Sequence, residues 1–148
     1  MKILVSACLL GTACRYDGES RPCEAVLALA KEHTLIPVCP EILGGLATPR
    51  LPSERVGERV MRCDGEDVTE AYQKGAQEVL RFARILDVRT AILKEKSPAC
   101  GCGKIYDGTF SRTLKDGNGV LSALLIENGI RVMGETEIAE KWQTSSAK

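Results

Sequence analysis

Short apolar runs alternate with longer amphipathic segments along this chain. Apolar runs rich in β-branched residues predict buried strands, and such runs occupy residues 2–7, 34–38, 88–93 and 130–133. Apolar residues at helical spacing predict helices that begin at Pro22, at Asp67 or Thr69, near Gly119 and at Glu135. Because strands that alternate with helices pack as a parallel sheet between two helical layers, the pattern predicts an α/β fold.

We therefore expect a Rossmann-like or flavodoxin-like three-layer sandwich, with a mostly parallel sheet of about four strands and a small hairpin insertion. The hairpin signal is Asp64-Gly65, which lies between two short strand-like runs in residues 59–68. Residues 41–59 contain a Gly-Gly pair and two prolines, which predict a long irregular loop of the kind that is usually functional. Residues 1–142 are expected to form a single domain, and residues 143–148 a polar tail.

Charge and composition narrow the function classes. The 148 residues include 20 lysines and arginines and 20 aspartates and glutamates, so no basic field is available to hold a nucleic acid polymer. The apolar amino-terminal run is too short to span a bilayer and lacks a cleavage pattern, which predicts a cytoplasmic protein without a membrane partner. The oligomeric state stays open, and a homodimer is one option.

Seven cysteines stand out in this composition. In a reducing compartment an odd, dispersed set is not a disulfide framework, and metal binding or thiol chemistry becomes the question. Cys8, Cys39 and Cys100 each follow a different predicted strand. Because ligands in open α/β sheets bind beyond the carboxyl ends of the strands, we expect these three thiols to meet at one edge of the sheet.

The cysteine spacing indicates the kind of metal centre. Structural zinc sites pair their cysteines closely, whereas Cys8 and Cys39 have no such partner apart from Cys14. Soft thiolates also select iron–sulfur clusters, and three protein ligands would leave one iron open to a substrate. The single histidine, His33, excludes a histidine-rich site. Cys23 and Cys63 are each compatible with a small buried hydrophobic residue.

Several segments together resemble the 2-thiouracil desulfurase family over nearly the whole chain, up to about Glu135. They are SACLLG followed by RYDG, then PVCPEILGGLATPR, GEDVTEAYQKGA, and LKEKSPACG followed by IYDGTF. The resemblance implies a 4Fe-4S cluster held by Cys8, Cys39 and Cys100, the same three cysteines that strand placement indicates. It also implies two catalytic residues, the glutamate of CPE and the serine of the SPACG segment, here Glu41 and Ser97.

The implied activity is the non-redox removal of sulfur from a thiolated pyrimidine, either free 2-thiouracil or a thiouridine derivative. A thiocarbonyl sulfur could bind the open iron, Glu41 could act as a general base on water, and Ser97 could relay a proton or orient the ring. Gly44 and Gly45 could let the backbone approach the substrate, and Arg15 could meet a nucleotide phosphate, as could Arg50.

Two cysteines depart from the family's usual pattern, Cys14 and Cys102, and Ala99 stands where serine is frequent. Cys102 as a fourth ligand would close the open iron, but the single glycine between it and Cys100 makes joint ligation geometrically hard. We interpret Cys102 as a spare, oxidisable thiol.

Two other functions fit the same sequence. In the first, Cys100 and Cys102 form a persulfide or disulfide without iron, as in a thiol redox or sulfur-carrier protein. In the second, the chain is a non-catalytic nucleotide-binding module on a Rossmann-like sheet.

Overall fold

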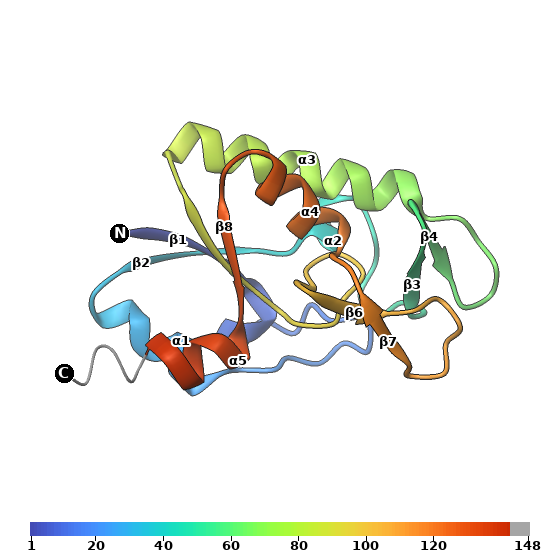
Figure 1. Ribbon diagram of the computed structural model, residues 1–148, viewed down its shortest axis with the longest axis horizontal. Helices are drawn as coiled ribbons and strands as arrows, with labels where there is room; N and C mark the ends of the chain where they lie inside the picture. Colours follow the sequence, from blue (N-terminus) through green and yellow to red (C-terminus); the bar gives the residue numbers. More distant parts are fainter. Residues whose placement is uncertain (143–148) are drawn as a thin grey trace.

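The central sheet consists of four parallel strands in the order β2-β1-β5-β8 (Figure 1). Their bounds are Lys2–Ser6 for β1, Thr34–Val38 for β2, Thr90–Leu93 for β5 and Arg131–Gly134 for β8. The computed structural model describes residues 1–142, so the polar tail predicted at residues 143–148 lies outside the described residues. Because β1 lies between β2 and β5, the strand order reverses at β1, which is the usual place for a ligand crevice.

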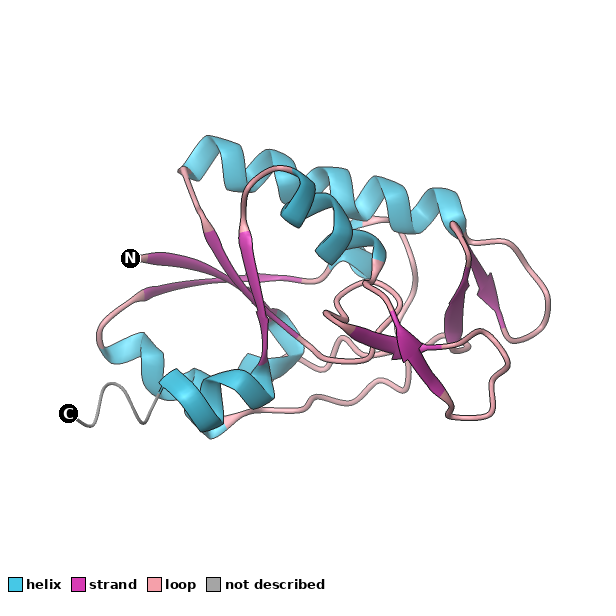
Figure 2. Ribbon diagram, in the orientation of Figure 1, coloured by secondary structure: helices cyan, strands magenta, loops and turns pink. Residues whose placement is uncertain are grey.

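Helices cover both faces of this sheet, which confirms the predicted three-layer α/β fold (Figure 2). One face carries α2 (Pro40–Leu43), α3 (Thr69–Leu86) and α4 (Val120–Glu127). The other carries α1 (Glu24–Ala28), α5 (Glu135–Glu137) and the π-helical turn Ile138–Trp142, with short 3₁₀ segments at Ala7–Leu10 and Leu29–Lys31. No helix within residues 1–142 has the length and apolar composition that a membrane span requires.

Strand periodicity divides the core between the two helical layers. Ile3 and Val5 of β1 pack with the α1 layer, whereas Leu4 packs with the α3 and α4 layer. The same alternation appears in β5, where Ile92 joins the first cluster and its neighbour Leu93 joins the second. These strands are buried on both faces, and this is why they read as continuous apolar runs in the sequence.

The prediction that the hairpin turns at Asp64-Gly65 was wrong. The paired strands are β3 (Ser53–Val56) and β4 (Arg59–Arg62), joined by a two-residue turn that contains Gly57. Gly57 adopts a φ of 61°, the left-handed conformation that tight hairpin turns require. The Asp64-Gly65 turn closes only an isolated bridge between Met61 and Asp67.

A second hairpin lies in residues 104–116, where the sequence pattern had predicted neither a strand nor a helix. Its strands are β6 (Lys104–Tyr106) and β7 (Leu114–Asp116), each of three residues. The two hairpins lie near each other beyond the end of the sheet where β1 and β2 finish (Figure 1). The segment predicted as one long irregular loop likewise contains α2 and β3.

Helices α2 and α3 touch through glycine. A Cβ atom on Gly75 would lie 1.7 Å from the carbonyl oxygen of Pro40, and one on Gly44 would lie 2.0 Å from the carbonyl oxygen of Ala71. Only glycine permits this backbone contact, which fixes α2 against the longest helix of the fold. The contact matters for the site, because α2 carries Glu41.

Candidate functional site

One cavity of about 660 Å³ is lined by residues that directly follow β1, β2 and β5. The residues around it include five cysteines, namely Cys8, Cys14, Cys39, Cys63 and Cys100, and both predicted catalytic residues, Glu41 and Ser97. The three cysteines expected to meet at the sheet edge therefore surround one space, together with Cys14 and the exposed Cys63.

Each of the three predicted ligands is placed by a short structural element. Cys8 lies in the 3₁₀ turn directly after β1, and Cys39 is the extended residue that precedes α2. Cys100 lies within the turn that closes when the amide of Gly101 donates to the carbonyl oxygen of Ser97 at 2.9 Å. Cys8 and Cys100 are each 6% exposed, so their thiols belong to the wall of the cavity rather than to the outer surface.

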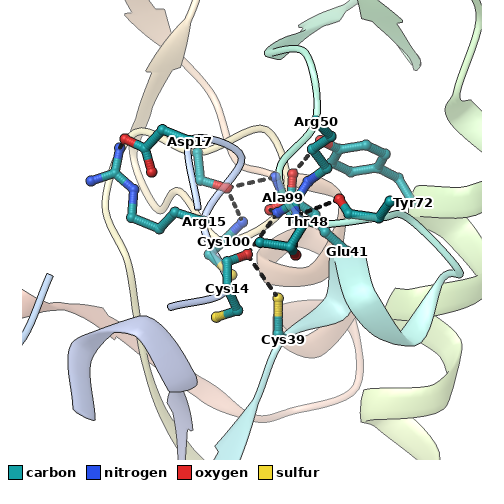
Figure 3. A network of polar contacts seen from close by, with 12 residues as sticks. Cys14, Arg15, Asp17, Cys39, Glu41, Thr48, Arg50, Tyr72, Ala99 and Cys100 are labelled. Carbon is teal, nitrogen blue, oxygen red and sulfur yellow. Dashed lines mark hydrogen bonds and ion pairs between the residues drawn. The ribbon is translucent and has the colours of Figure 1, made fainter. Parts of the chain in front are cut away.

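Cys14 was not among the residues predicted to form the site. It is 3% exposed, and its thiol interacts with those of both Cys8 and Cys39. The Cys39 thiol also donates to the carbonyl oxygen of Cys14 at 3.9 Å (Figure 3). A signal was present in the sequence, since Cys14 follows Cys8 closely on the loop after the first strand.

Burial and mutual contact disfavour ionisation of these thiols. The hydrogen bond with Cys14, together with burial, raises the pKa of Cys39, and burial raises the pKa of Cys100. The hydrogen bond with Cys39 lowers the pKa of Cys14. The hydrogen bond with Cys8 and burial raise this pKa by more, so the pKa of Cys14 is raised overall. Thiolates here need a cationic partner, and a metal centre that displaces the thiol protons supplies one.

The thiols do not form a site for a single ion. Within residues 1–142, no three cysteine, histidine, aspartate or glutamate side chains converge tightly enough to hold one metal ion. In an iron–sulfur cluster, by contrast, each thiolate binds a different iron, and the ligands surround the whole inorganic core. Soft sulfur donors spread around one cavity therefore fit a cluster better than a lone zinc ion.

The other cysteines lie differently. Cys102 is absent from the cavity wall, and its thiol donates to the carbonyl oxygen of Val132 at 3.8 Å. Cys63 lines the cavity but is exposed, in contrast to the buried role considered for it. Cys23 is half-buried and packs against the core on the α1 side.

Glu41 projects from the first turn of α2 into a polar network (Figure 3). Its Oε2 accepts a hydrogen bond from Nη2 of Arg50 at 3.0 Å, and its Oε1 accepts one from the hydroxyl of Tyr72. Burial, and then the negative charge of Glu41, raise the pKa of Tyr72, so the phenol stays protonated as a donor. Both carboxylate oxygens are thus held in place by side chains from outside α2.

Arg50 is not available to a phosphate, contrary to the prediction that it could meet one. Its side chain is 8% exposed, and its guanidinium also donates to the carbonyl oxygens of Cys14 and Ala47 at 3.0 and 3.1 Å. A buried cation of this kind is stable only with such partners, and here they are supplied by Glu41 and the loop backbone.

Ser97 has a structural role as well as a place in the cavity. Its Oγ accepts hydrogen bonds from the amides of Ala99 and Cys100 at 3.0 and 3.1 Å, which orders the loop that carries Cys100. Among the described residues the Ser97 hydroxyl proton has no acceptor, so it can be donated to a molecule in the cavity.

The residues predicted to bind substrate divide into two groups. Arg15 lines the cavity, with a distant ion pair to Asp17 at 3.8 Å. Gly44 and Gly45 do not line it, and the close backbone approach at Gly44 serves helix α3 instead.

The fold and the site together define a class of protein: an α/β sandwich with a thiol-lined cavity at the edge of its sheet. The chain belongs to the 2-thiouracil desulfurase family, whose sequence profile matches residues 3–137. It is 43% identical over 146 residues to the uncharacterized protein YbbK of Bacillus subtilis strain 168, covering 92% of this chain and 97% of that protein. The solved structure of the [4Fe-4S]-dependent thiouracil desulfidase TudS matches with a TM-score of 0.90 and 43% identity, over 99% of each chain. These matches confirm the predicted family and fold.

Breaking the Arg50–Glu41 pair is expected to cost much more stability than breaking an exposed pair. The Arg50→Gln substitution leaves a largely buried carboxylate, 18% exposed, without its cation, and should lower the free energy of unfolding by about 3 kcal/mol. The matched control is Arg89→Gln, which breaks the Arg89–Asp87 pair, whose side chains are 82% and 81% exposed, and should change it by less than about 0.5 kcal/mol. Urea unfolding of identically prepared proteins measures both, and equal losses would contradict the assignment.

Proposed function

We propose that this protein removes sulfur from a thiolated pyrimidine such as 2-thiouracil, and returns the oxo pyrimidine and sulfide. The observation that carries the proposal is that Cys8, Cys39 and Cys100, from three separate strand ends, line one cavity together with Glu41 and Ser97. The family match and the likeness to the [4Fe-4S]-dependent desulfidase TudS support it.

We assign Cys8, Cys39 and Cys100 as ligands of a 4Fe-4S cluster with one iron left open. The donor set fits, because all three are soft thiols that line one cavity. When bound, the cluster would supply a Lewis-acidic iron that holds the substrate sulfur and accepts it as sulfide.

The protein's own residues would carry out the hydrolytic part of the reaction. Water adds to the ring carbon that bears sulfur, the carbon–sulfur bond breaks, and the sum is thiocarbonyl plus water giving carbonyl plus hydrogen sulfide. Glu41 is the proposed base that takes the proton of water, since Arg50 and Tyr72 fix its carboxylate beside the cavity. Ser97 is the proposed donor to a ring nitrogen, with its hydroxyl oriented by two backbone amides.

The wall of the cavity supplies cations as well as thiols. Arg15, Lys94 and Arg112 line it, and its volume of about 660 Å³ lies within the range of small-molecule sites. We therefore propose that a thiolated uridine nucleotide is also accepted, with Arg15 near its phosphate.

The cluster and its ligands can be tested by composition and activity together. Protein isolated without oxygen should hold about four iron and four sulfide atoms per chain and release sulfide from 2-thiouracil. Cys39→Ser should lose both properties. Cys102→Ser is the matched control, since Cys102 lies away from the cavity, and should retain both. Iron-free protein that still takes sulfur from a donor through Cys102 would instead favour the sulfur-carrier function.

The proposed role of Glu41 predicts a loss in rate without a loss of cluster. Glu41→Gln keeps the side chain's size and removes the base, so kcat on 2-thiouracil should fall on the order of a hundredfold. Iron and sulfide content should stay at the wild-type level. A variant with normal kcat would rule out Glu41 as the base, and one without iron would assign it to cluster assembly.

The proposed nucleotide contact predicts an effect limited to phosphorylated substrates. Arg15→Gln should raise KM for a 4-thiouridine monophosphate roughly tenfold, because a charge-assisted hydrogen bond is lost. KM for free 2-thiouracil should change little. Equal effects on both substrates would contradict a phosphate contact at Arg15.

A further inference from the structure

A buried carboxylate joins the two hairpins. Glu54 of β3 is 9% exposed, and its Oε1 accepts hydrogen bonds from the amides of Gly108 at 2.9 Å and Phe110 at 3.1 Å. Both amides belong to the loop between β6 and β7. Because burying a carboxylate is costly without such donors, Glu54 and this loop stabilise each other.

The docked loop has little freedom to move. Gly108 has a φ of 96°, and a Cβ there would lie 2.7 Å from Cγ2 of Val56, so the loop rests directly on the first hairpin. Within the loop, Oδ1 of Asp107 accepts from the amide and hydroxyl of Thr109 at 3.0 and 2.6 Å. The Ser111 hydroxyl lies 2.5 Å from that of Thr109, and it continues the chain of contacts.

The result of this docking is an aromatic side chain at the cavity. Phe110 has a φ of 57°, which is unfavourable for a bulky residue and is held only because the surrounding contacts fix it. Its side chain lines the cavity that holds the thiols, and the residue remains 38% exposed. An exposed aromatic ring in a strained backbone conformation points to binding rather than to core packing.

Two tyrosines also line the cavity, but they are placed differently. The guanidinium of Arg15 lies over the ring of Tyr16, 5.6 Å from the centre of the ring. Tyr106 belongs to β6. Within the described part of the chain, Phe110 has neither a cation on its ring nor a place in a strand, and its position depends on the Glu54 contact.

We propose that Phe110 is a substrate-binding residue whose ring stacks on the pyrimidine, and that Glu54 is the positioning residue that holds Phe110 there. This inference rests on the proposed function. Stacking of a base on an aromatic side chain contributes about 1–3 kcal/mol to binding. Because the π face of the pyrimidine is the same in a base, a nucleoside and a nucleotide, the contact suits all three.

Holoprotein variants at Phe110 test the stacking contact. Phe110→Leu should raise KM for 2-thiouracil roughly tenfold with iron content unchanged, and Phe110→Trp should stay closer to the wild type. Phe82→Leu, the same change on α3 away from the cavity, is the matched control and should leave KM unchanged. The proposal is overturned if Phe110→Leu leaves KM unchanged, or if Phe82→Leu raises it equally.

A binding measurement separates this proposal from the proposed function. Uracil should quench the fluorescence of the Phe110→Trp variant more strongly than that of the wild type, whose sequence has one tryptophan. If the wild type fails to desulfurise 2-thiouracil, the proposed function is wrong, while quenching by uracil still decides whether a ring stacks at position 110. Absence of quenching overturns the stacking contact even in an active enzyme.

The role of Glu54 is tested by its coupling to Phe110. Glu54→Leu removes the acceptor and should raise KM about as much as Phe110→Leu, whereas Glu54→Gln keeps an acceptor oxygen and should rescue most of the effect. Because both changes act through one contact, the double variant should be no worse than Phe110→Leu alone. Additive effects, or a loss of iron in Glu54→Gln, would show that Glu54 acts elsewhere.

Discussion

Parallel pairing of β1 with both of its neighbours is the constraint on which the rest of the structure depends. Ser6 pairs with Val38, and Val5 pairs with Ile92, so the three strands end at nearly the same level. The loops after these strands carry the cysteines and therefore begin at one edge. A register slip of one residue would turn the buried side chains of a strand to the wrong layer, so core packing fixes the level of the thiols.

The sequence predicted the features that arise from strand periodicity, and missed those that depend on tertiary contact. The four sheet strands are continuous apolar runs, and the cysteines after three of them could be placed together by topology. The β6–β7 hairpin could not be predicted, because its strands have three residues each and show no clear alternation. Tyr72 was also missed, although it shares helical spacing with buried Ala76 and Val79, since its contact with Glu41 depends on how α2 meets α3.

The surroundings of Glu41 favour fixed geometry over maximal stability. Placing Arg50 and Glu41 away from water has a desolvation cost, and Nε of Arg50 is a buried donor without a partner among the described residues. The gain is a carboxylate that is held from two directions beside the cavity. Pre-arranged charge of this kind suits a reaction in which a proton must move at a defined atom.

The Glu54 contact ties segments that are 54 and 56 residues apart in the sequence. Neither hairpin can therefore be exchanged between relatives as an independent module. A chimera that imports a foreign β6–β7 loop without its matching β3 strand would place two backbone amides opposite an unsuitable partner, and a foreign β3 strand would do the converse. Recombination within this architecture should thus respect both hairpins as one inherited unit.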